Sequence, residues 1–148
     1  MRILWGFSWF RRLRAAARSW FPPHSLGDRG ENAAERFLRR HGFQILERRV
    51  RGQLGEIDLI AVDGRTIVFV EVKTRRSHAK GHPAEAVDAR KQRKLTRLAL
   101  VWLKRHGLLH HAARFDVVAV TWPRDQRHPT IEHYRNAFDA VGRWQMFC

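Results

Sequence analysis

Hydrophobic residues recur along the middle of the chain with the period of β-strands, over residues 56–62 and 66–74. Both faces of each run are largely apolar, which predicts central strands of a sheet that is covered on both sides. Asp63-Gly64 between the runs is a typical two-residue hairpin turn, because both residue types accept the positive φ values that such turns require. Three polar residues interrupt the apolar pattern, namely Asp58, Glu71 and Lys73.

The hairpin turn determines which of these polar residues face one another. With Asp63-Gly64 as the loop, Asp58 lies opposite Phe69 and diagonal to Glu71. Opposite residues share a face of the sheet, so Asp58, Glu71 and Lys73 are expected on one face. Glu71 and Lys73 would then be roughly 6.6 Å apart along their strand. A three-residue loop would move Asp58 to the other face, which makes the register a test of the predicted site.

Two helices and three further strands are predicted around this hairpin. The first helix runs over residues 29–41, with Asp28 as its N-cap and Gly42 as its C-terminal stop. The second helix begins at Pro83 and ends near His106. The remaining elements are strands over 43–51, 114–122 and 130–134, followed by a turn and a terminal helix over 136–144.

Three charged residues on these elements have two interpretations each. Glu31 lies at the margin of the buried arc of the first helix, where it forms a capping box with Asp28, points inward to the site, or does both. Lys91 projects into the apolar stripe of the second helix, and it either snorkels to solvent or approaches the site. Asp116 is a further candidate metal ligand, although a lone aspartate at the start of a strand is more often structural.

The charge balance predicts a polyanionic partner. The chain has 29 Lys+Arg against 14 Asp+Glu, which gives a formal net charge of +15. Nucleic acid is the first partner that this charge suggests, and an anionic membrane surface is the second. The second predicted helix carries a broad basic flank. A solvated or phosphate-facing strand edge is predicted from Arg48, Arg49 and Arg51.

The length of 148 residues accommodates one domain with an appendage. Residues 1–25 form a basic extension rich in Trp and Arg, and residues 26–148 form the domain. Drawn as a helix, residues 1–22 are amphipathic, which predicts weak contact with an anionic membrane surface. The other interpretation is that this segment packs on the domain or is partly disordered. A secretory signal peptide fits less well, because no cleavage region follows the short apolar run.

Two features bear on the cellular compartment. The sequence has no apolar run of about 18 residues, so no transmembrane helix is expected. Its single cysteine, Cys148, excludes an internal disulfide framework and argues against a zinc site built on thiolates. A reducing cytoplasm is therefore the expected location.

Asp58 and Glu71, together with a strand carbonyl, would form an oxygen-rich site of the kind that Mg²⁺ or Mn²⁺ prefers. Burying these carboxylates without a partner would be heavily penalised, so an ion or a positive group is expected beside them. Lys73 is one such group, in a structural ion pair with Glu71 or Asp58. Alternatively, Lys73 orients or deprotonates an attacking water and neutralises developing charge during phosphodiester cleavage.

Four ordered motifs resemble the YraN-like family of bacterial proteins, within the restriction-endonuclease-like PD-(D/E)xK nuclease superfamily. They are GENAA at residues 30–34, GEIDLIA at 55–61, VFVEVKTR at 68–75 and NAF at 136–138. The resemblance runs from about Leu26 to Phe138. It implies an α/β sandwich with a mixed central sheet, a β-hairpin core and flanking helices in the order αβββαβ. Ile57 stands where the superfamily name has proline, and residues 1–25 have no counterpart in the family pattern.

The resemblance also implies roles for individual residues. Asp58, Glu71 and the Val72 carbonyl would be the ligands of Mg²⁺ or Mn²⁺. Lys73 would be the catalytic lysine, and Glu31 a fourth acidic group, as in Holliday-junction resolvases. The basic residues expected to contact DNA beside this site are Arg75, Arg76, Lys91 and Lys94.

The function expected from these features is a Mg²⁺-dependent endonuclease that hydrolyses phosphodiester bonds in DNA, including branched or damaged DNA. A homodimer is expected if both strands are cut, because this usually needs two sites. The alternative is a non-catalytic nucleic-acid-binding protein that retains the nuclease fold. A third hypothesis places the protein at a membrane surface through residues 1–22, with the nuclease domain as cargo.

Overall fold

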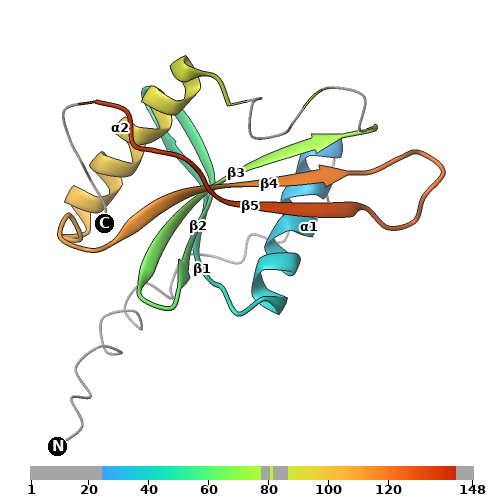
Figure 1. Cartoon of the computed structure of the whole chain (residues 1–148), viewed down its shortest axis with the longest axis horizontal. Helices are drawn as coiled ribbons and strands as arrows, with labels where there is room; N and C mark the ends of the chain where they lie inside the picture. Colours follow the sequence, from blue (N-terminus) through green and yellow to red (C-terminus); the bar gives the residue numbers. More distant parts are fainter. Residues whose placement is uncertain (1–24, 78–80, 82–86, 143–148) are drawn as a thin grey trace, which may run out of the picture.

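Five strands and two helices make up the part of the chain that the computed structural model describes, residues 25–77, 81 and 87–142 (Figure 1). In chain order they are α1 (Leu26–Arg40), β1 (Gln44–Gly52), β2 (Gly55–Asp63), β3 (Thr66–Arg75), α2 (Ala89–Arg105), β4 (Ala113–Thr121) and β5 (Thr130–Phe138). The expected amphipathic helix of residues 1–22 lies outside the described residues. Neither α1 nor α2, the two described helices, is long and apolar enough to cross a lipid bilayer.

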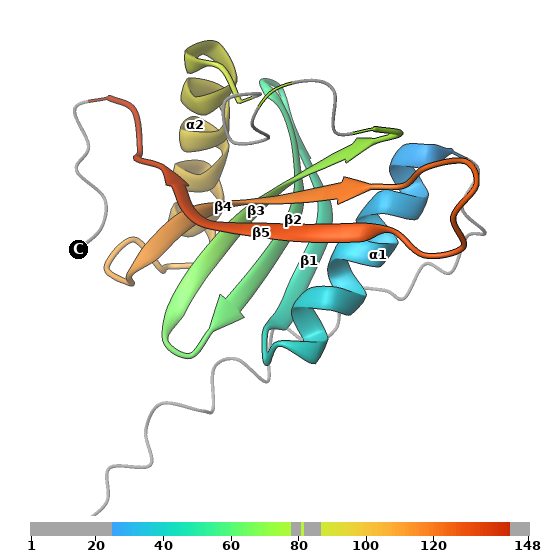
Figure 2. The same ribbon diagram turned by 45° about the vertical axis from the view of Figure 1, so that its right-hand side comes forward.

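The strands form one mixed sheet in the order β1-β2-β3-β4-β5. Neighbouring strands are antiparallel except β3 and β4, which run parallel and are connected through α2. The two helices cover opposite faces of the sheet (Figures 1 and 2), so each face has its own core. Phe69 and Trp102 belong to the core under α2, whereas Leu38 and Val118 belong to the core under α1. The expected mixed α/β class is confirmed.

The central hairpin has a different loop from the predicted one. Asp63 pairs with Thr66, so the loop consists of Gly64 and Arg65 rather than Asp63 and Gly64. Gly64 takes the left-handed φ of 61° that the turn needs, while Asp63 stays in the ladder and accepts a hydrogen bond from Arg114 Nη2 at 2.9 Å. The register differs from the predicted one by an even number of residues, and the expected faces are retained because side chains alternate with a period of two.

Both helices begin at different residues from those predicted. α1 starts directly after its N-cap Ser25, and Ser25 and Asp28 form the reciprocal hydrogen bonds of a capping box. Asp28 is therefore inside the helix and is not its N-cap. α2 starts at Ala89 rather than at Pro83, which lies outside the described residues. The Asp88 side chain caps α2 by accepting a hydrogen bond from a main-chain N–H of its first turn at 2.7 Å.

The C-terminal end of the described chain is a strand where a turn and a helix were predicted. β5 continues to Phe138, so residues 136–138 are strand where the turn before the predicted terminal helix was expected. The end of that predicted segment, residues 143–144, lies outside the described residues. Asn136 adopts a left-handed φ of 49°, and its N–H donates to Asp116 Oδ1 at 2.9 Å across an irregularity in the β4–β5 pairing. The pairing then resumes, because Phe138 lies opposite Phe115 and stacks on its ring. The element order is thus αβββαββ, one strand more than the order αβββαβ that the family resemblance implies.

Candidate functional site

Asp58 lies where β2 and β3 stop pairing. The regular ladder between these strands ends one residue short of Asp58, and Phe69, its predicted partner, lies opposite Ile60 instead. Beyond the ladder the Asp58 side chain takes the place of a main-chain acceptor, because its Oδ2 accepts a hydrogen bond from the Val72 N–H at 2.7 Å. This bond joins Asp58 to the segment of β3 that carries Glu71 and Lys73.

The environment of Asp58 favours its protonated form. Burial is the largest cause that raises the pKa of Asp58 to about 7, and the negative charge of Glu71 is the second. Glu31 also raises this pKa, whereas the hydrogen bond from Val72 and the positive charge of Lys91 lower it. Near neutral pH Asp58 is divided between its two protonation states, and an added positive partner would favour the ionised state.

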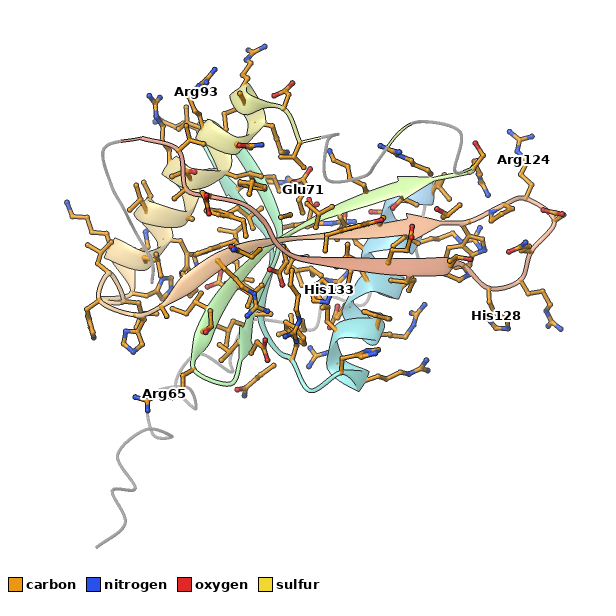
Figure 3. The ribbon with its side chains drawn as sticks, in the orientation of Figure 1. Arg65, Glu71, Arg93, Arg124, His128 and His133 are labelled. Carbon is orange, nitrogen blue, oxygen red and sulfur yellow. The ribbon has the colours of Figure 1, made fainter. Side chains whose placement is uncertain are left out.

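Glu71 is a buried carboxylate on the side of β3 that faces α2 (Figure 3), and its exposed fraction is 5%. Its Oε1 forms ion pairs with Lys73 Nζ at 2.9 Å and with Lys91 Nζ at 3.4 Å. Its Oε2 is buried and has no hydrogen-bond partner among the described residues. Because an unpartnered buried carboxylate oxygen is costly, a cation or a hydrogen-bond donor would be strongly favoured beside this atom.

Two lysines from different elements converge on Glu71. Lys73 follows it on β3 and forms the ion pair that the sequence allowed as one interpretation. Lys91 comes from the first turn of α2 and places its Nζ 3.4 Å from Glu71 Oε1, which agrees with the interpretation that it approaches the site. The Asp88 cap bonds the Lys91 N–H and thereby fixes the turn that carries this lysine.

Glu31 faces Arg49 of β1. Arg49 Nε lies 2.7 Å from Glu31 Oε2, and Arg49 Nη2 bonds Asp28. The capping-box interpretation of Glu31 is wrong, because Asp28 occupies that position. The inward interpretation agrees with the effect of Glu31 on the pKa of Asp58. Arg49 has a left-handed φ of 50°, which is uncommon for arginine, and no sequence signal marks it.

A close contact between α1 and β3 brings Glu31 to this end of the sheet. A Cβ atom on Gly30 would lie 1.8 Å from Thr74 Oγ1 and 2.8 Å from Thr74 Cβ. Only glycine permits this approach, so Gly30 fixes the distance between the helix that carries Glu31 and the strand that carries Glu71 and Lys73.

Three of the four predicted DNA contacts are engaged within the protein. Arg75 Nη1 donates to the Gly81 carbonyl at 3.1 Å, and Arg76 Nη1 donates to the Trp122 carbonyl at 3.4 Å. Lys91 pairs with Glu71. Lys94 is half-buried and forms no ion pair within the described part of the chain.

Two acidic side chains, Asp58 and Glu71, are available here as metal donors. No group of three or more His, Cys, Asp or Glu side chains within residues 25–77, 81 and 87–142 is arranged to hold a metal ion. Arg49 holds Glu31, which leaves Asp58 and Glu71 as side-chain donors. The unpartnered Oε2 of Glu71 and the raised pKa of Asp58 are both features that a divalent cation would relieve.

Asp116 is structural, as the more frequent interpretation of such an aspartate predicted. It is fully buried and accepts from Arg114 Nε at 2.9 Å, while His133 Nε2 lies 2.8 Å from its other oxygen. Burial alone would raise the pKa of Asp116, but the hydrogen bonds to His133 and Arg114 lower it below its ordinary value. His133 becomes a neighbour of Asp116 only through the pairing of β4 with β5, whereas Arg114 lies two residues before Asp116 on β4 itself.

The predicted phosphate-facing edge of β1 is neutralised by acidic side chains. Arg48 Nη1 lies 3.1 Å from Glu35 Oε2, and Arg51 Nε lies 2.7 Å from Glu56 Oε2. Arg49 is paired with two acids of α1. These arginines are solvated on one side, but they serve as partners of carboxylates on neighbouring elements.

Comparisons with known sequences identify relatives across most of the chain. A model of the Uncharacterised protein family UPF0102 matches residues 30–120. A UPF0102 protein of Rhodopirellula baltica is 47% identical over 147 residues, which covers 91% of this chain and 88% of the relative. A UPF0102 protein of Geobacter metallireducens is 50% identical over 117 residues, covering 79% and 94%. One from Rhodococcus jostii is 47% identical over 114 residues, covering 77% and 96%.

Proposed function

The chain belongs to the uncharacterised protein family UPF0102, and we propose that it is a divalent-metal-dependent endonuclease that hydrolyses phosphodiester bonds in DNA. Branched or damaged DNA is included among the proposed substrates. We also propose that the family belongs to the PD-(D/E)xK nuclease superfamily. It rests on the buried carboxylate of Glu71, whose Oε1 meets two lysines and whose Oε2 has no partner among the described residues. Such a group destabilises the fold unless something binds it, which is typical of functional sites.

Asp58, Glu71 and the Val72 carbonyl are the groups proposed to hold Mg²⁺ or Mn²⁺. Mg²⁺ prefers oxygen donors and keeps several water ligands, so two carboxylates and one carbonyl are sufficient protein donors. What the ion supplies when bound is acidification of the attacking water and neutralisation of phosphate charge. Asp58 and Glu71 would both be ionised in that state, although burial and mutual repulsion raise the pKa of Asp58 otherwise.

Lys73 is proposed to act on the reacting atoms. Its ion pair with Glu71 Oε1 at 2.9 Å holds the ammonium group at the carboxylate site. From there the ammonium can donate a hydrogen bond to a phosphate oxygen as negative charge develops, and the neutral amine can accept a proton from the attacking water. Lys91 adds a second positive charge beside Glu71 from the other element and is suited to binding a phosphate oxygen.

A non-catalytic nucleic-acid-binding protein is the second candidate, and one observation favours it. Lys73 and Lys91 already pair with one oxygen of Glu71, so the protein itself supplies part of the positive charge that the carboxylate needs. Such a protein would bind DNA with a strong dependence on salt and would leave it intact.

Incubation of the purified full-length protein with labelled linear, flap and four-way-junction DNA tests the proposal. Each substrate is incubated with Mg²⁺, with Mn²⁺ and with chelator. We expect metal-dependent cleavage that falls at least about 100-fold in Glu71→Gln and in Lys73→Ala, because each removes a charged group at the reacting phosphate. Glu132→Gln serves as the matched control, since Glu132 is an exposed strand carboxylate on β5.

The outcomes separate the candidates. Equal cleavage by wild type and by Glu71→Gln would identify a contaminating nuclease or another site. Salt-dependent binding without cleavage under either metal would favour the non-catalytic protein. Loss of cleavage in the Glu132→Gln control would show that the variants act through general damage to the fold.

A further inference from the structure

α2 carries a continuous basic surface. Its 17 residues include seven lysines and arginines and no acidic residue. At 3.6 residues per turn, six of these basic residues fall within an arc of about 120° on one side of the helix. This basic stripe consists of Arg90, Arg93, Lys94, Arg97, Lys104 and Arg105, with Val101 among them. The buried side chains of α2, including Leu95, Ala99 and Trp102, occupy the opposite side.

The charges of the basic stripe have no acidic partner among the described residues. None of its six members forms an ion pair or hydrogen bond through its side chain with another described residue. Figure 3 shows Arg93 pointing away from the sheet at the outer side of α2. Uncompensated like charges along a helix repel one another, so this arrangement lowers stability unless an anionic partner binds.

The basic stripe begins at the candidate site. Lys91, in the first turn of α2, lies at the margin of the stripe and places its Nζ 3.4 Å from Glu71 Oε1. From Arg90 to Arg105 the helix rises about 22 Å. The stripe therefore leads away from the carboxylates in one direction along the surface of the protein.

We propose that the basic stripe binds the phosphate backbone of a duplex DNA arm on one side of the carboxylate site. A length of about 22 Å corresponds to about seven base pairs. Contacts of lysine and arginine with phosphates fix position without reading sequence, so the arm would be held independently of its sequence. The proposal rests on the proposed function only in taking DNA as the ligand.

The chemistry of the stripe disfavours other anionic partners. Binding in a membrane interface requires large apolar side chains on the exposed side of the helix, and Val101 is the sole apolar member here. Single-stranded nucleic acid is usually held by exposed aromatic side chains, and the stripe contains none. A second copy of the chain would bring like charges together if the two stripes met.

A matched pair of double variants tests the proposal in the full-length protein. Arg93→Gln/Arg97→Gln removes two charges of the basic stripe. Arg36→Gln/Arg40→Gln removes two exposed arginines of α1 at the same helical spacing and is the control. Both variants lower the formal net charge from +15 to +13. Binding to a duplex is measured with chelator present, so turnover plays no part.

We expect the α2 variant to lower the slope of log Kd against log salt concentration by about 1.8, the value for two lost phosphate contacts. The α1 control should keep a slope close to that of wild type. Equal changes in both variants would show that net charge alone governs binding, and would overturn the proposal. An unchanged slope in the α2 variant would overturn it as well.

A length series tests the geometry. The affinity difference between wild type and the α2 variant should grow with duplex length up to about seven base pairs and stay constant beyond this length. A larger effect on single-stranded DNA or on phosphatidylserine vesicles would assign the stripe to another partner and would overturn the proposal. Nuclease activity that is absent from every substrate would refute the proposed function while leaving this binding result intact.

Discussion

The arginines of β1 and the basic residues of α2 carry the same charge, but they differ in whether acidic side chains pair with them. Each arginine of the triplet at residues 48, 49 and 51 has an acidic partner on α1 or β2. The basic stripe of α2 has none among the described residues. The acids of α1 and β2 that lie beside β1 neutralise the first set, whereas α2 itself supplies no acid to the second. A basic run in sequence therefore does not identify a ligand surface until its acidic neighbours are known.

In the candidate site, the pKa of Asp58 is affected by charged residues from both regions. The pKa of Asp58 is raised by Glu31, which belongs to the neutralised region, and lowered by Lys91, which belongs to the edge of the basic stripe. Burial and Glu71 remain its larger causes. Changes in either region should therefore be detected at Asp58, in opposite directions.

Replacing Asp58 has the largest expected effect. The pKa of about 7 in the folded state lies above the ordinary value of 3.8, so the folded protein binds more protons between these values. The stability that this group contributes is present below pH 4 and is lost as pH rises through 7, on the order of 4 kcal/mol in total. Asp58→Asn should remove this decline, as measured by urea unfolding between pH 4 and pH 8.

The exposed Asp139 provides the control for that measurement, because Asp139→Asn should leave the decline in place. A titration of the Asp58 carboxyl by NMR sharpens the comparison further. Glu31→Gln should lower its pKa and Lys91→Met should raise it, following the signs of the two charges. Shifts of the same sign in both variants would contradict the position of Asp58 between the two regions.

The second prediction disrupts the ion pairs between α1 and the β1 arginines by moving α1. Gly30→Ala places a methyl group 1.8 Å from Thr74 Oγ1, so the helix must move away from β3, at a cost of about 3 kcal/mol in the free energy of unfolding. Thr74→Ala in the same chain should recover part of this loss, because it removes the closest atom.

The neighbouring Gly27 is the control for Gly30, since its added Cβ would come no closer than 3.6 Å to Ser25 Oγ. Gly27→Ala should stabilise α1 by about 0.5–1 kcal/mol through the lower backbone entropy of the unfolded chain. Urea unfolding of the three variants gives the comparison. A Gly30→Ala protein as stable as wild type would show that α1 can reposition without cost.

Much of the fold was predictable from local pattern, and the departures have identifiable causes. The alternating pattern predicted strands β2 and β3 and the correct faces for Asp58 and Glu71. A register shift by two residues leaves each side chain on the same face of the sheet. The loop itself was wrong, since the long-range bond of Arg114 keeps Asp63 in the ladder. The extension of β5 to Phe138 was missed for a similar reason, namely its pairing with Phe115.

The candidate site was predictable where its residues belong to the β2–β3 hairpin. Glu71 and Lys73 share a strand, so their proximity followed from their spacing. The contribution of Lys91 depended on where α2 begins, and that boundary was misplaced by several residues. The pairing of Glu31 with Arg49 could not be foreseen, because it requires a left-handed backbone at a residue type that rarely adopts one.

The third prediction separates charge pairing from backbone conformation at Arg49. Both Arg49→Ala and Arg49→Gly remove the ion pair with Glu31. Gly accommodates the φ of 50° and Ala does not, so Arg49→Gly should be more stable than Arg49→Ala by about 1 kcal/mol. At Arg48, where φ is not positive, the order should reverse because glycine weakens a strand. Thermal unfolding of the four variants measures both orders, and the same order at both positions would contradict the backbone argument.

The smallest effect is expected from the basic stripe of α2. Arg93→Gln/Arg97→Gln breaks no ion pair among the described residues, so the free energy of unfolding should change by less than about 0.5 kcal/mol. Any change should be a gain, because the two arginines repel each other at a spacing of four residues. Arg48→Gln removes the pair with Glu35 and should instead cost up to about 1 kcal/mol.

Added salt should shift the stability changes of the β1 and α2 variants in opposite directions. Added salt weakens both attraction and repulsion between exposed charges, so the loss in Arg48→Gln and the gain in the α2 variant should both shrink toward zero. Urea unfolding at low and high ionic strength measures this convergence. A loss of stability in the α2 variant that persists at high salt would mean that Arg93 and Arg97 support the fold by packing, and the stripe would then resemble β1 rather than contrast with it.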